Sequence, residues 1–449
     1  MPSRLGCLLE AAASPLVTIL RDALRPEADL HLVGGTVRDA LLELPNADVD
    51  LATVLHPDEV VRRLTGAGVR VIETGLQHGT VTAVIHGENI EITTFRTLEA
   101  GRFASTIEAD LALRDFTMNA LAWSLERQEL LDPFSGAADL RAQLLRAVGD
   151  PGARFREDPL RMMRLLRFGP AADRSVDPNT LAAVSALAHL IDSVSIERIR
   201  VELERVMIAP NPGAALRLLV TTGLADRVLP ELLPSVGFEQ NEFHIHDVFE
   251  HTIWVVERTP PTARLRLAAL FHDLGKPASL TIGEDGRRHF YRHEEIGGDI
   301  CREAMHRLRF SNEETKAVTT LVRYHMRPID CGPAGVRRLI RDLGPWFSDW
   351  RSLKLADSPP KMTADEFATR LARFDEMVRD EKERSKAAPW GTLAIDGNDL
   401  IELGMKPGPE LGRILRELEE AVIENPSLNV RATLLERARG ALAALSRTE

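Results

Sequence analysis

Two carboxylates that follow a pair of glycines are the first residues of the chain with the types and spacing for chemistry. Gly34 and Gly35 come directly after a short strand predicted over His31–Val33, and Asp48 and Asp50 follow shortly afterwards. Residues i and i+2 of a strand point to the same face, so a strand here would place the two carboxylates side by side. Such a pair beside a phosphate site suits the Mg²⁺ ions of a phosphoryl displacement. A loop with two solvated aspartates is the alternative.

The residues after the glycines would complete an anion site. A helix predicted over 36–43 would direct its free N–H groups at a group bound above the glycines. Arg38 in the first turn of this helix can reach the same anion. Further along, Glu91 in a predicted strand would supply a third carboxylate, or else pair with an arginine at a sheet edge.

A second group of potential metal ligands lies between residues 244 and 330. His272 and Asp273 are adjacent, Lys276 follows them and could neutralise a phosphate, and further histidines lie upstream and downstream. Histidine nitrogens and an aspartate oxygen suit a divalent transition metal or Mg²⁺. This pattern resembles that of the HD-type metal phosphohydrolases, and a purely structural domain is the alternative. The predicted ligands are His251, His272, Asp273, His293 and His325, with Asp330 as a further candidate.

The spacing of apolar residues predicts the elements that position these side chains. Residues 8–24 fit one amphipathic helix, and residues 30–96 alternate between strands and helices. Residues 170–235 are leucine-rich and predicted to be helical, and the pattern of Ala364–Lys386 predicts a long charged helix. Within the mixed part we predict a helix at about 57–66 and strands near 69–74, 80–86 and 90–96.

Composition limits the architecture and the location of the protein. A chain of 449 residues is too long for one core, so we expect about two to four domains. The net charge of −11 argues against indiscriminate nucleic-acid binding but leaves room for a local basic patch. The three cysteines lie far apart and form neither a disulfide framework nor a zinc pattern, and no apolar run is long enough to cross a membrane. We therefore expect a cytoplasmic protein without membrane contact.

The glycine and aspartate motifs resemble the head domain of the class II tRNA nucleotidyltransferases, which belong to the polymerase-beta-like nucleotidyltransferases. The resemblance rests on Val33-Gly34-Gly35-x-Val37-Arg38-Asp39 and on Asp48-x-Asp50. The next motif of the family matches Asp110-Leu111-x-Leu113-Arg114-Asp115, where the guanidinium of Arg114 would contact the triphosphate or ribose. Asp115 and Asn119 would orient the sugar, with a surface ion pair between Arg114 and Asp115 as the alternative. The family usually has a second basic residue at the position of Leu113, so that contact is missing here.

The resemblance extends to Arg154–Phe168, where it assigns one pair of residues to the base of the incoming nucleotide. Pro159 and the acidic residues before it predict the start of a helix, so Asp158 and Arg161 would be neighbours on one helical face. A carboxylate and a guanidinium complement the amino group and ring nitrogen of cytosine and adenine, and repel the edges of guanine and uracil. An internal ion pair on a solvated basic helix is the alternative. The nucleotide-binding residues predicted in this way are Gly35, Arg38, Arg114, Asp158, Arg161, Arg164 and Arg167.

The fold that the resemblance implies is of the α+β class. A polymerase-beta-like nucleotidyltransferase head with a mostly antiparallel sheet would be followed by all-helical neck, body, HD and tail domains. The implied domains are the head over 1–150, the neck and body over 151–235, an HD-type phosphohydrolase domain over 236–340 and a tRNA-binding tail over 341–449. In the tail, Lys406 lies beside a predicted helix start that could hold a tRNA phosphate.

The reaction that the resemblance implies is transfer of CMP, with AMP as a further nucleotide, from CTP or ATP to the 3′-hydroxyl of tRNA. Mg²⁺ would serve the head, and a divalent transition metal or Mg²⁺ would serve the HD domain. The alternatives are an HD-type phosphohydrolase whose head only binds nucleotide, an RNA-binding protein without catalysis, and a bacterial poly(A) polymerase. Poly(A) polymerases tend to have a strongly basic C-terminal extension, which the mixed charges before Glu449 do not resemble.

The segment Thr97–Ala109 bears on which nucleotides are added. It has thirteen residues, whereas CCA-adding relatives have a longer flexible segment that would act as a lever on the templating pair when specificity switches from C to A. CC-adding relatives have a shortened segment and stop after two C residues. The length therefore predicts a CC-adding enzyme. Free variation in loop length, with full CCA addition, is the alternative.

Overall fold

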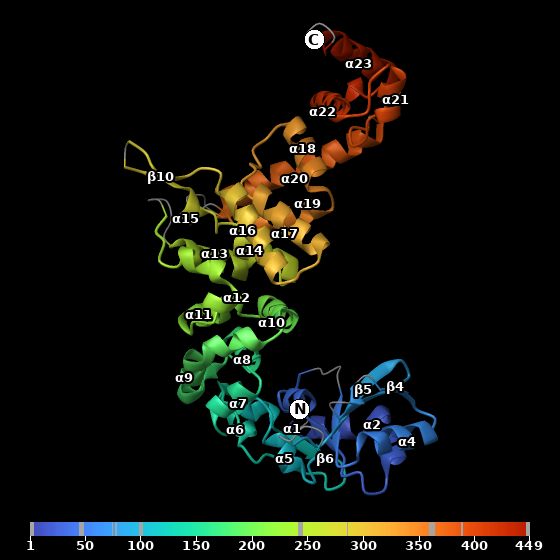
Figure 1. Ribbon diagram of the computed structural model, residues 1–449, viewed down its shortest axis with the longest axis vertical. Coiled ribbons are helices and arrows are strands. Elements are labelled where there is room, and N and C mark those ends of the chain that lie inside the picture. The colour runs from blue at the N-terminus through green and yellow to red at the C-terminus, as the bar shows by residue number, and fades with distance from the viewer. Residues whose placement is uncertain are drawn as a thin grey trace. The chain divides into compact units, whose positions relative to one another are not determined.

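The structure, a computed structural model, describes residues 4–44, 49–73, 75–76, 79–97, 102–240, 246–284, 286–358, 364–387 and 389–445. The chain forms two compact units, residues 1–233 and residues 234–449, which we call unit 1 and unit 2 (Figure 1). In these described parts, no helix combines the length and the apolar character needed to cross a membrane.

Unit 1 is built on one seven-stranded sheet with the order β3-β4-β5-β2-β1-β6-β7. Among the described strands, β2 and β5 pair in parallel, and the other pairings in this sheet are antiparallel. The predicted mixed head with a mostly antiparallel sheet is therefore confirmed. The strands are β1 His31–Val33, β2 Asp50–Thr53, β3 Arg70–Ile72, β4 Thr80–Ile85, β5 Glu88–Thr94, β6 Ala122–Ser124 and β7 Leu130–Leu131.

The core of unit 1 fixes the strand ends that carry the glycines and the aspartate. β1 is buried throughout, and buried residues alternate with partly exposed ones along β4, as expected for a strand with one face in the core. Val33 and Ala52 on neighbouring strands pack in one cluster with Phe95, Ile107 and Leu111. The end of β1 and the start of α3, Gly35–Leu41, are thereby held close to β2.

The N-terminal segment differs from the single helix predicted over 8–24. It forms α1, Arg4–Ala12, and α2, Pro15–Leu24. The Ser14 side chain accepts a hydrogen bond from the backbone N–H of Val17 at 3.3 Å, and Pro15 occupies the first helical position. The prediction was wrong because a proline starts a helix readily but cannot continue one.

Helices pack against the sheet and make up most of the rest of the described part of unit 1. The helix predicted over 57–66 is confirmed as α4, Pro57–Gly66, and α8 packs against α10 and α11. Two short strands, β8 Leu144–Leu145 and β9 Ser175–Val176, form a parallel pair. In the chain β8 precedes α8 and β9 follows it. The other helices are α3 Gly35–Leu41, α5 Ile107–Leu111, α6 Gly136–Arg141, α7 Pro151–Glu157, α8 Arg161–Phe168, α9 Pro178–Leu187, α10 Ile196–Ile208, α11 Pro212–Thr221 and α12 Ala225–Val228.

The described residues of unit 2 are helical apart from one hairpin of β10, Leu280–Ile282, and β11, Arg288–Phe290, and from the connecting segments. Its central helix is α14, Ala263–Phe271, which is buried from Leu265 to Phe271 and packs against α13, α16, α17 and α19. The long charged helix is confirmed as α20, Ala364–Ala387. The remaining helices are α13 Val248–Arg258, α15 Lys276–Ser279, α16 His293–Arg307, α17 Asn312–Tyr324, α18 Pro333–Leu343, α19 Phe347–Ala356, α21 Gly397–Glu402, α22 Pro409–Glu424 and α23 Arg431–Leu445.

Candidate functional sites

The turn at Gly34 brings three parts of unit 1 together. Gly34 precedes α3 and has φ +62° and ψ −124°, a conformation that residues with a Cβ rarely adopt. A Cβ at this position would lie 2.6 Å from Nη1 of Arg114 and 3.9 Å from Oδ2 of Asp50. The backbone of the turn therefore faces both a guanidinium and a carboxylate, at the place where the sequence predicts an anion.

We expect Gly34→Ala to raise the Kd for a nucleoside triphosphate about tenfold, because the new methyl group displaces Arg114. The strained backbone should also lower the free energy of unfolding by about 1–3 kcal/mol. Equilibrium dialysis with CTP and urea denaturation measure the two effects. Gly68→Ala is the matched control, since Gly68 has φ +77° and open space around it. The Gly68→Ala variant should have a lower free energy of unfolding but an unchanged Kd for CTP. Equal Kd values for the two variants would contradict the expectation.

A cavity of about 590 Å³ opens beside this turn. Its described lining contains eight arginines and three aspartates, so its charge favours a polyanion. Every nucleotide-binding residue predicted from the sequence borders this cavity, which we call the arginine cavity. Asp48, the first predicted magnesium ligand, lies outside the described residues. The lining residues are Gly34, Gly35, Arg38, Asp50, Arg96, Leu113, Arg114, Asp115, Asn119, Asp158, Leu160, Arg161, Arg164, Arg167, Phe168, Arg198 and Arg205.

β2 and β5 place two carboxylates next to each other. Asp50 and Glu91 are direct neighbours in the parallel register of these strands, so both side chains leave the same face of the sheet. Glu91 is exposed and does not belong to the described lining of the arginine cavity. Because β5 lies between β4 and β2, the alternative of a sheet-edge carboxylate is wrong.

Arg114 pairs with Asp110. The alternative drawn from the sequence was a surface ion pair with Asp115. Nη2 of Arg114 lies 3.2 Å from Oδ2 of Asp110, and Nε of Arg96 lies 2.7 Å from the other oxygen of that carboxylate. The Arg114 side chain is only 15% exposed, and burial lowers the pKa of its guanidinium. The Asp110 carboxylate therefore holds Arg114 against the Gly34 turn.

Asp115 and Asn119 connect the sheet to α8. Asp115 accepts hydrogen bonds from Nδ2 of Asn119 at 3.0 Å and from Nε of Arg164 at 2.7 Å, while Oδ1 of Asn119 accepts one from Nη1 of Arg38 at 2.9 Å. Burial alone would raise the pKa of the Asp115 carboxyl, but the charge of Arg164 and these hydrogen bonds hold that pKa below its usual value. Asp115 therefore stays charged and fixes Arg164 on α8.

The predicted helical face that carries Asp158 and Arg161 is not formed. α7 ends at Glu157, Asp158 has an extended backbone, and α8 begins at Arg161. Oδ2 of Asp158 lies 2.9 Å from Nη2 of Arg198, whereas Nη1 of Arg161 lies 3.0 Å from Oε2 of Glu157. The prediction was wrong because Pro159 disfavours a helical backbone at the residue before it. Both side chains nevertheless border the arginine cavity.

Sequence reasoning missed the wall of this cavity that α10 provides. Arg198 and Arg205 border the cavity, and Glu202 between them is buried and lies 2.6 Å from Nε of Arg167 and 3.2 Å from Nη1 of Arg205. The spacing of four and three residues places these side chains on one helical face and could have indicated it. Phe168 was also missed, and the guanidinium carbon of Arg167 lies 3.8 Å from the centre of its ring.

The predicted ligands of unit 2 converge on the carboxylate of Asp273. Its Oδ2 lies 3.4 Å from Nε2 of His251 and 3.2 Å from Nε2 of His272. Its Oδ1 lies 3.4 Å from Nε2 of His293 and 3.7 Å from Nε2 of His325. The structure therefore brings all of these predicted ligands into one cluster, although they come from four different helix regions.

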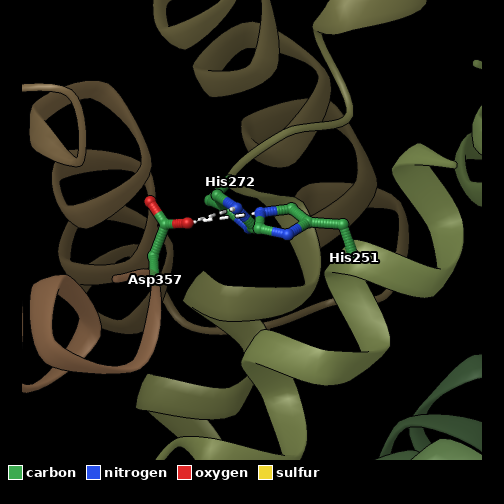
Figure 2. Close-up of side chains that lie close together, drawn as sticks. All are labelled: His251, His272 and Asp357. Carbon is green, nitrogen blue, oxygen red and sulfur yellow. Dashed lines mark ion pairs between the residues drawn. The ribbon is translucent and has the colours of Figure 1, made fainter. Parts of the chain in front are cut away.

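Asp357, which follows α19, is a further member that sequence reasoning missed. Figure 2 shows its carboxylate directed at two histidine rings, and its Oδ1 lies 3.2 Å from Nε2 of His251 and 3.9 Å from Nε2 of His272. The candidate Asp330 was wrong, because this residue is exposed and pairs with Arg370 at 2.9 Å. The cluster therefore has two halves, within each of which the ligand atoms lie within 4.8 Å of one another: His251, His272 and Asp357, and Asp273, His293 and His325.

The histidine rings have the orientation of metal ligands. Nδ1 of His272, His293 and His325 donates to the carbonyl oxygen three residues earlier, at 2.7, 2.8 and 2.6 Å. A carbonyl oxygen can only accept, so each neutral ring carries its proton on Nδ1 and directs the lone pair of Nε2 into the cluster. The Nε2 atoms of His293 and His325 are 3.2 Å apart. Two lone pairs at this distance need a proton or a cation between them, so the residues fit a metal ion.

Charge in the cluster also suits a divalent ion. Burial alone would raise the pKa of the Asp273 carboxyl, but its contacts with His272 and with the charged Lys276 hold that pKa well below its usual value. Nζ of Lys276 donates to Oδ2 of Asp273 at 2.6 Å. Burial lowers the pKa of His325 and keeps its imidazole neutral. Imidazole nitrogens around a carboxylate are a donor set that first-row divalent ions prefer.

Four families match successive parts of the chain. The Poly A polymerase head domain matches residues 30–146 and the HD domain matches residues 245–386. An RNA-binding region of polymerase A matches residues 175–235, and domain 2 of the tRNA nucleotidyltransferases matches residues 375–438. The fold and the arginine cavity of unit 1 therefore belong to a nucleotidyltransferase.

Similar proteins over nearly the whole chain are tRNA nucleotidyltransferases. An A-adding tRNA nucleotidyltransferase of Deinococcus radiodurans is 33% identical over 413 residues, which cover 87% of this chain and 90% of the relative. A CCA-adding enzyme of Latilactobacillus sakei is 33% identical over 92% of this chain and 94% of the relative. The crystal structure of the Bacillus stearothermophilus CCA-adding enzyme in complex with CTP is 26% identical with a TM-score of 0.68, and covers 98% of this chain and 99% of that chain. The chain belongs to the family of tRNA nucleotidyltransferases and is an enzyme of that type.

Proposed function

We propose that unit 1 transfers CMP from CTP to the 3′-hydroxyl of tRNA and releases pyrophosphate. The observation that carries this proposal is the arginine cavity, which opens where the Gly34 turn meets Asp50. Mg²⁺ held by Asp48 and Asp50, with Glu91 as a third carboxylate, would activate the hydroxyl group and neutralise the phosphates. A solved relative in complex with CTP, at 26% identity, supports the choice of nucleotide.

The arginines of the cavity would bind and orient the nucleotide. Arg38 and Arg114 lie beside the glycine turn and would hold the triphosphate, while Asp115 and Asn119 orient the sugar. Arg164 is fixed by Asp115 at 2.6 Å, and Arg167 by the buried Glu202. Guanidinium groups that are already held by carboxylates lose little freedom when a phosphate binds, so they are preorganised for it.

Base selection would fall to Asp158 and Arg161. Nη2 of Arg161 donates to the carbonyl oxygen of Leu113 at 2.7 Å, and Nη2 of Arg198 donates to Asp158 at 2.9 Å. A cytosine that binds this pair would receive a hydrogen bond from Arg161 and donate its amino hydrogen to Asp158. The contacts with Leu113 and Arg198 would keep the two side chains at a set spacing before the base enters.

We expect Asp158→Ala to lower kcat/KM for CTP about tenfold or more and to increase incorporation of UMP, because the acceptor for the amino group is lost. Single-turnover assays with each nucleoside triphosphate measure both effects. Asp192→Ala removes a surface carboxylate that pairs with Arg227 in the same unit and should change neither. An unchanged preference for CTP in Asp158→Ala would assign base selection to other residues.

We further propose that the enzyme adds the two C residues and stops before A. The segment between Arg96 and α5 is short, and its described residues are tied down: Arg96 forms a β-bridge with Phe103, and the backbone N–H of Ala104 donates to the carbonyl oxygen of Phe95 at 2.7 Å. Leu98–Gly101 lie outside the described residues. A connector anchored in this way would leave the templating pair sized for a pyrimidine. The relatives named as CCA-adding and A-adding make full CCA addition the rival outcome.

A gel at single-nucleotide resolution decides between the two outcomes. The substrate is tRNA that lacks its last three nucleotides, incubated with CTP and ATP together. We expect the product to end at CC, because the pocket would not widen for a purine. Efficient completion to CCA would contradict CC-only addition and would leave the transfer reaction itself intact.

For unit 2 we infer hydrolysis of phosphate monoesters or of 2′,3′-cyclic phosphates with the help of a divalent transition metal or Mg²⁺. The observation that carries this second activity is the buried cluster in which Asp273 faces both pairs of histidines. Lys276 lies beside that carboxylate and would neutralise a phosphate. Assays of the wild-type protein with Mg²⁺, Mn²⁺, Ni²⁺ and Co²⁺ test the inference, and failure of all four ions to support hydrolysis would make the cluster structural.

A further inference from the structure

A hairpin in unit 2 leads directly into the metal-ligand cluster. β10 and β11 pair in antiparallel orientation, and Figure 1 shows the hairpin extending away from the helices of its unit. Its base is fixed, because the carbonyl oxygen of Phe290 accepts the hydrogen bond from Nδ1 of His293 at 2.8 Å. The ring of Phe290 also lies 6.2 Å from that of Phe238. The residues at the base of the hairpin therefore have a set position next to a predicted metal ligand.

Two rings at this base stack on each other, and one of them is exposed. The ring centres of His289 and Tyr291 are 5.3 Å apart and their planes differ by 12°. Tyr291 is 68% exposed, so its ring contributes little to the core of unit 2. An exposed aromatic ring of this kind is a surface on which the bases of single-stranded nucleic acid stack.

Arginines flank this stack, with acidic residues beyond them on both sides in the sequence. Residues 287–292 contain three arginines and no acidic residue. Arg288 pairs with Glu239 at 3.5 Å, and Arg292 pairs with Glu295. Ion pairs between exposed side chains contribute little free energy, so these arginines can exchange a carboxylate for a phosphate at low cost. Arginines interleaved with aromatic rings are typical of surfaces that bind single strands.

We propose that residues 287–292 form a platform that binds single-stranded RNA, whose phosphate-bearing end enters the cluster around Asp273. The proposal rests on the hydrolase activity inferred for unit 2 and names the substrate of that site as an RNA end. A base stacks on Tyr291, the arginines hold the phosphates on either side, and the strand continues past His293 to the metal ligands. A small phosphate monoester without bases makes none of these contacts.

Fluorine NMR tests the platform directly, because the chain has only two tyrosines, Tyr291 and Tyr324. Incorporation of 3-fluorotyrosine gives two ¹⁹F signals, which Tyr291→Phe assigns. We expect a short single-stranded RNA with a 2′,3′-cyclic phosphate to shift the Tyr291 signal and not that of Tyr324. Glycerol 2-phosphate should shift neither. A Tyr291 signal that does not respond to RNA would overturn the platform, whether or not unit 2 hydrolyses phosphates.

Kinetics separate the platform from the hydrolase itself. Tyr291→Ala should lower kcat/KM for the RNA about tenfold, through KM, and leave hydrolysis of glycerol 2-phosphate unchanged. Ile282→Thr is the matched control, because Ile282 is 69% exposed on the same hairpin and cannot stack. Equal losses on both substrates, or an equal loss with Ile282→Thr, would contradict the platform. If wild-type protein does not hydrolyse glycerol 2-phosphate, the hydrolase inference fails, and the fluorine signal still decides whether RNA binds.

Discussion

Asp273→Asn is expected to abolish metal-dependent hydrolysis by unit 2 and to leave nucleotide addition unchanged. The two oxygens of Asp273 face different pairs of histidines, at 3.2 Å from Nε2 of His272 and 3.4 Å from Nε2 of His293. Loss of this charge therefore weakens the binding of an ion in either half of the cluster. Because a metal ion at a phosphoryl group contributes several kcal/mol to the transition state, kcat/KM should fall about a thousandfold or more. Phosphate release and CMP addition are measured on the same preparation.

The control for this variant concerns the lysine that Asp273 neutralises. Removing one partner of a buried ion pair costs about 3–5 kcal/mol, so Asp273→Asn could lose activity by unfolding unit 2. The double variant Asp273→Asn with Lys276→Met removes both charges and should recover stability without recovering hydrolysis. His272→Ala with Asp273→Ala should likewise lose only hydrolysis. Full hydrolysis by either double variant would show that the cluster is not the site.

Asp50→Asn is expected to remove nucleotide addition while the fold stays intact. Its backbone N–H donates to Oγ1 of Thr36 at 2.9 Å, and the substitution keeps this contact and the side-chain volume. We expect the rate of CMP addition to fall about a thousandfold, since the charge that would hold Mg²⁺ is lost, while unfolding free energy changes by less than about 0.5 kcal/mol. Asp48→Ala should have the same effect on addition.

Nucleotide affinity distinguishes a metal ligand from a residue that only shapes the cavity. Without metal, Asp50 places a negative charge among the arginines that would bind the triphosphate, so Asp50→Asn should bind CTP in EDTA at least as tightly as wild type. Equilibrium dialysis measures this affinity. Weaker binding by the variant, or full nucleotide addition, would contradict the assignment of Asp50 as a metal ligand.

Features set by residue type and short spacing were predictable from the sequence. The class of fold, the mostly antiparallel head sheet and the long helix α20 are confirmed, because each depends on a local pattern of apolar residues or on a short motif. The break between α1 and α2 also follows from a local signal, Ser14 before Pro15. The predicted domain boundaries and the roles of the site residues stay predictions.

Contacts between distant residues were not predictable in this way. Arg198 pairs with Asp158 across 40 positions, and nothing in either neighbourhood indicates the other. Asp357 joins His251 and His272 only because α19 packs against α13 and α14. Asp330 lies closer to the histidines in the sequence than Asp357 does, but in the structure it pairs with Arg370 instead. Tertiary packing, which local sequence patterns do not encode, therefore determines which of the two carboxylates joins the cluster.

Nucleotide addition by unit 1 and hydrolysis by unit 2 are separated most directly by assaying both reactions in wild type, Asp50→Asn and Asp273→Asn. Addition is followed as transfer of label from the α-phosphate of CTP to tRNA that lacks its 3′ end, and hydrolysis as release of phosphate from glycerol 2-phosphate. We expect Asp50→Asn to lose only addition and Asp273→Asn to lose only hydrolysis. The loss of both reactions in either variant, or full addition by Asp50→Asn, would contradict two independent sites.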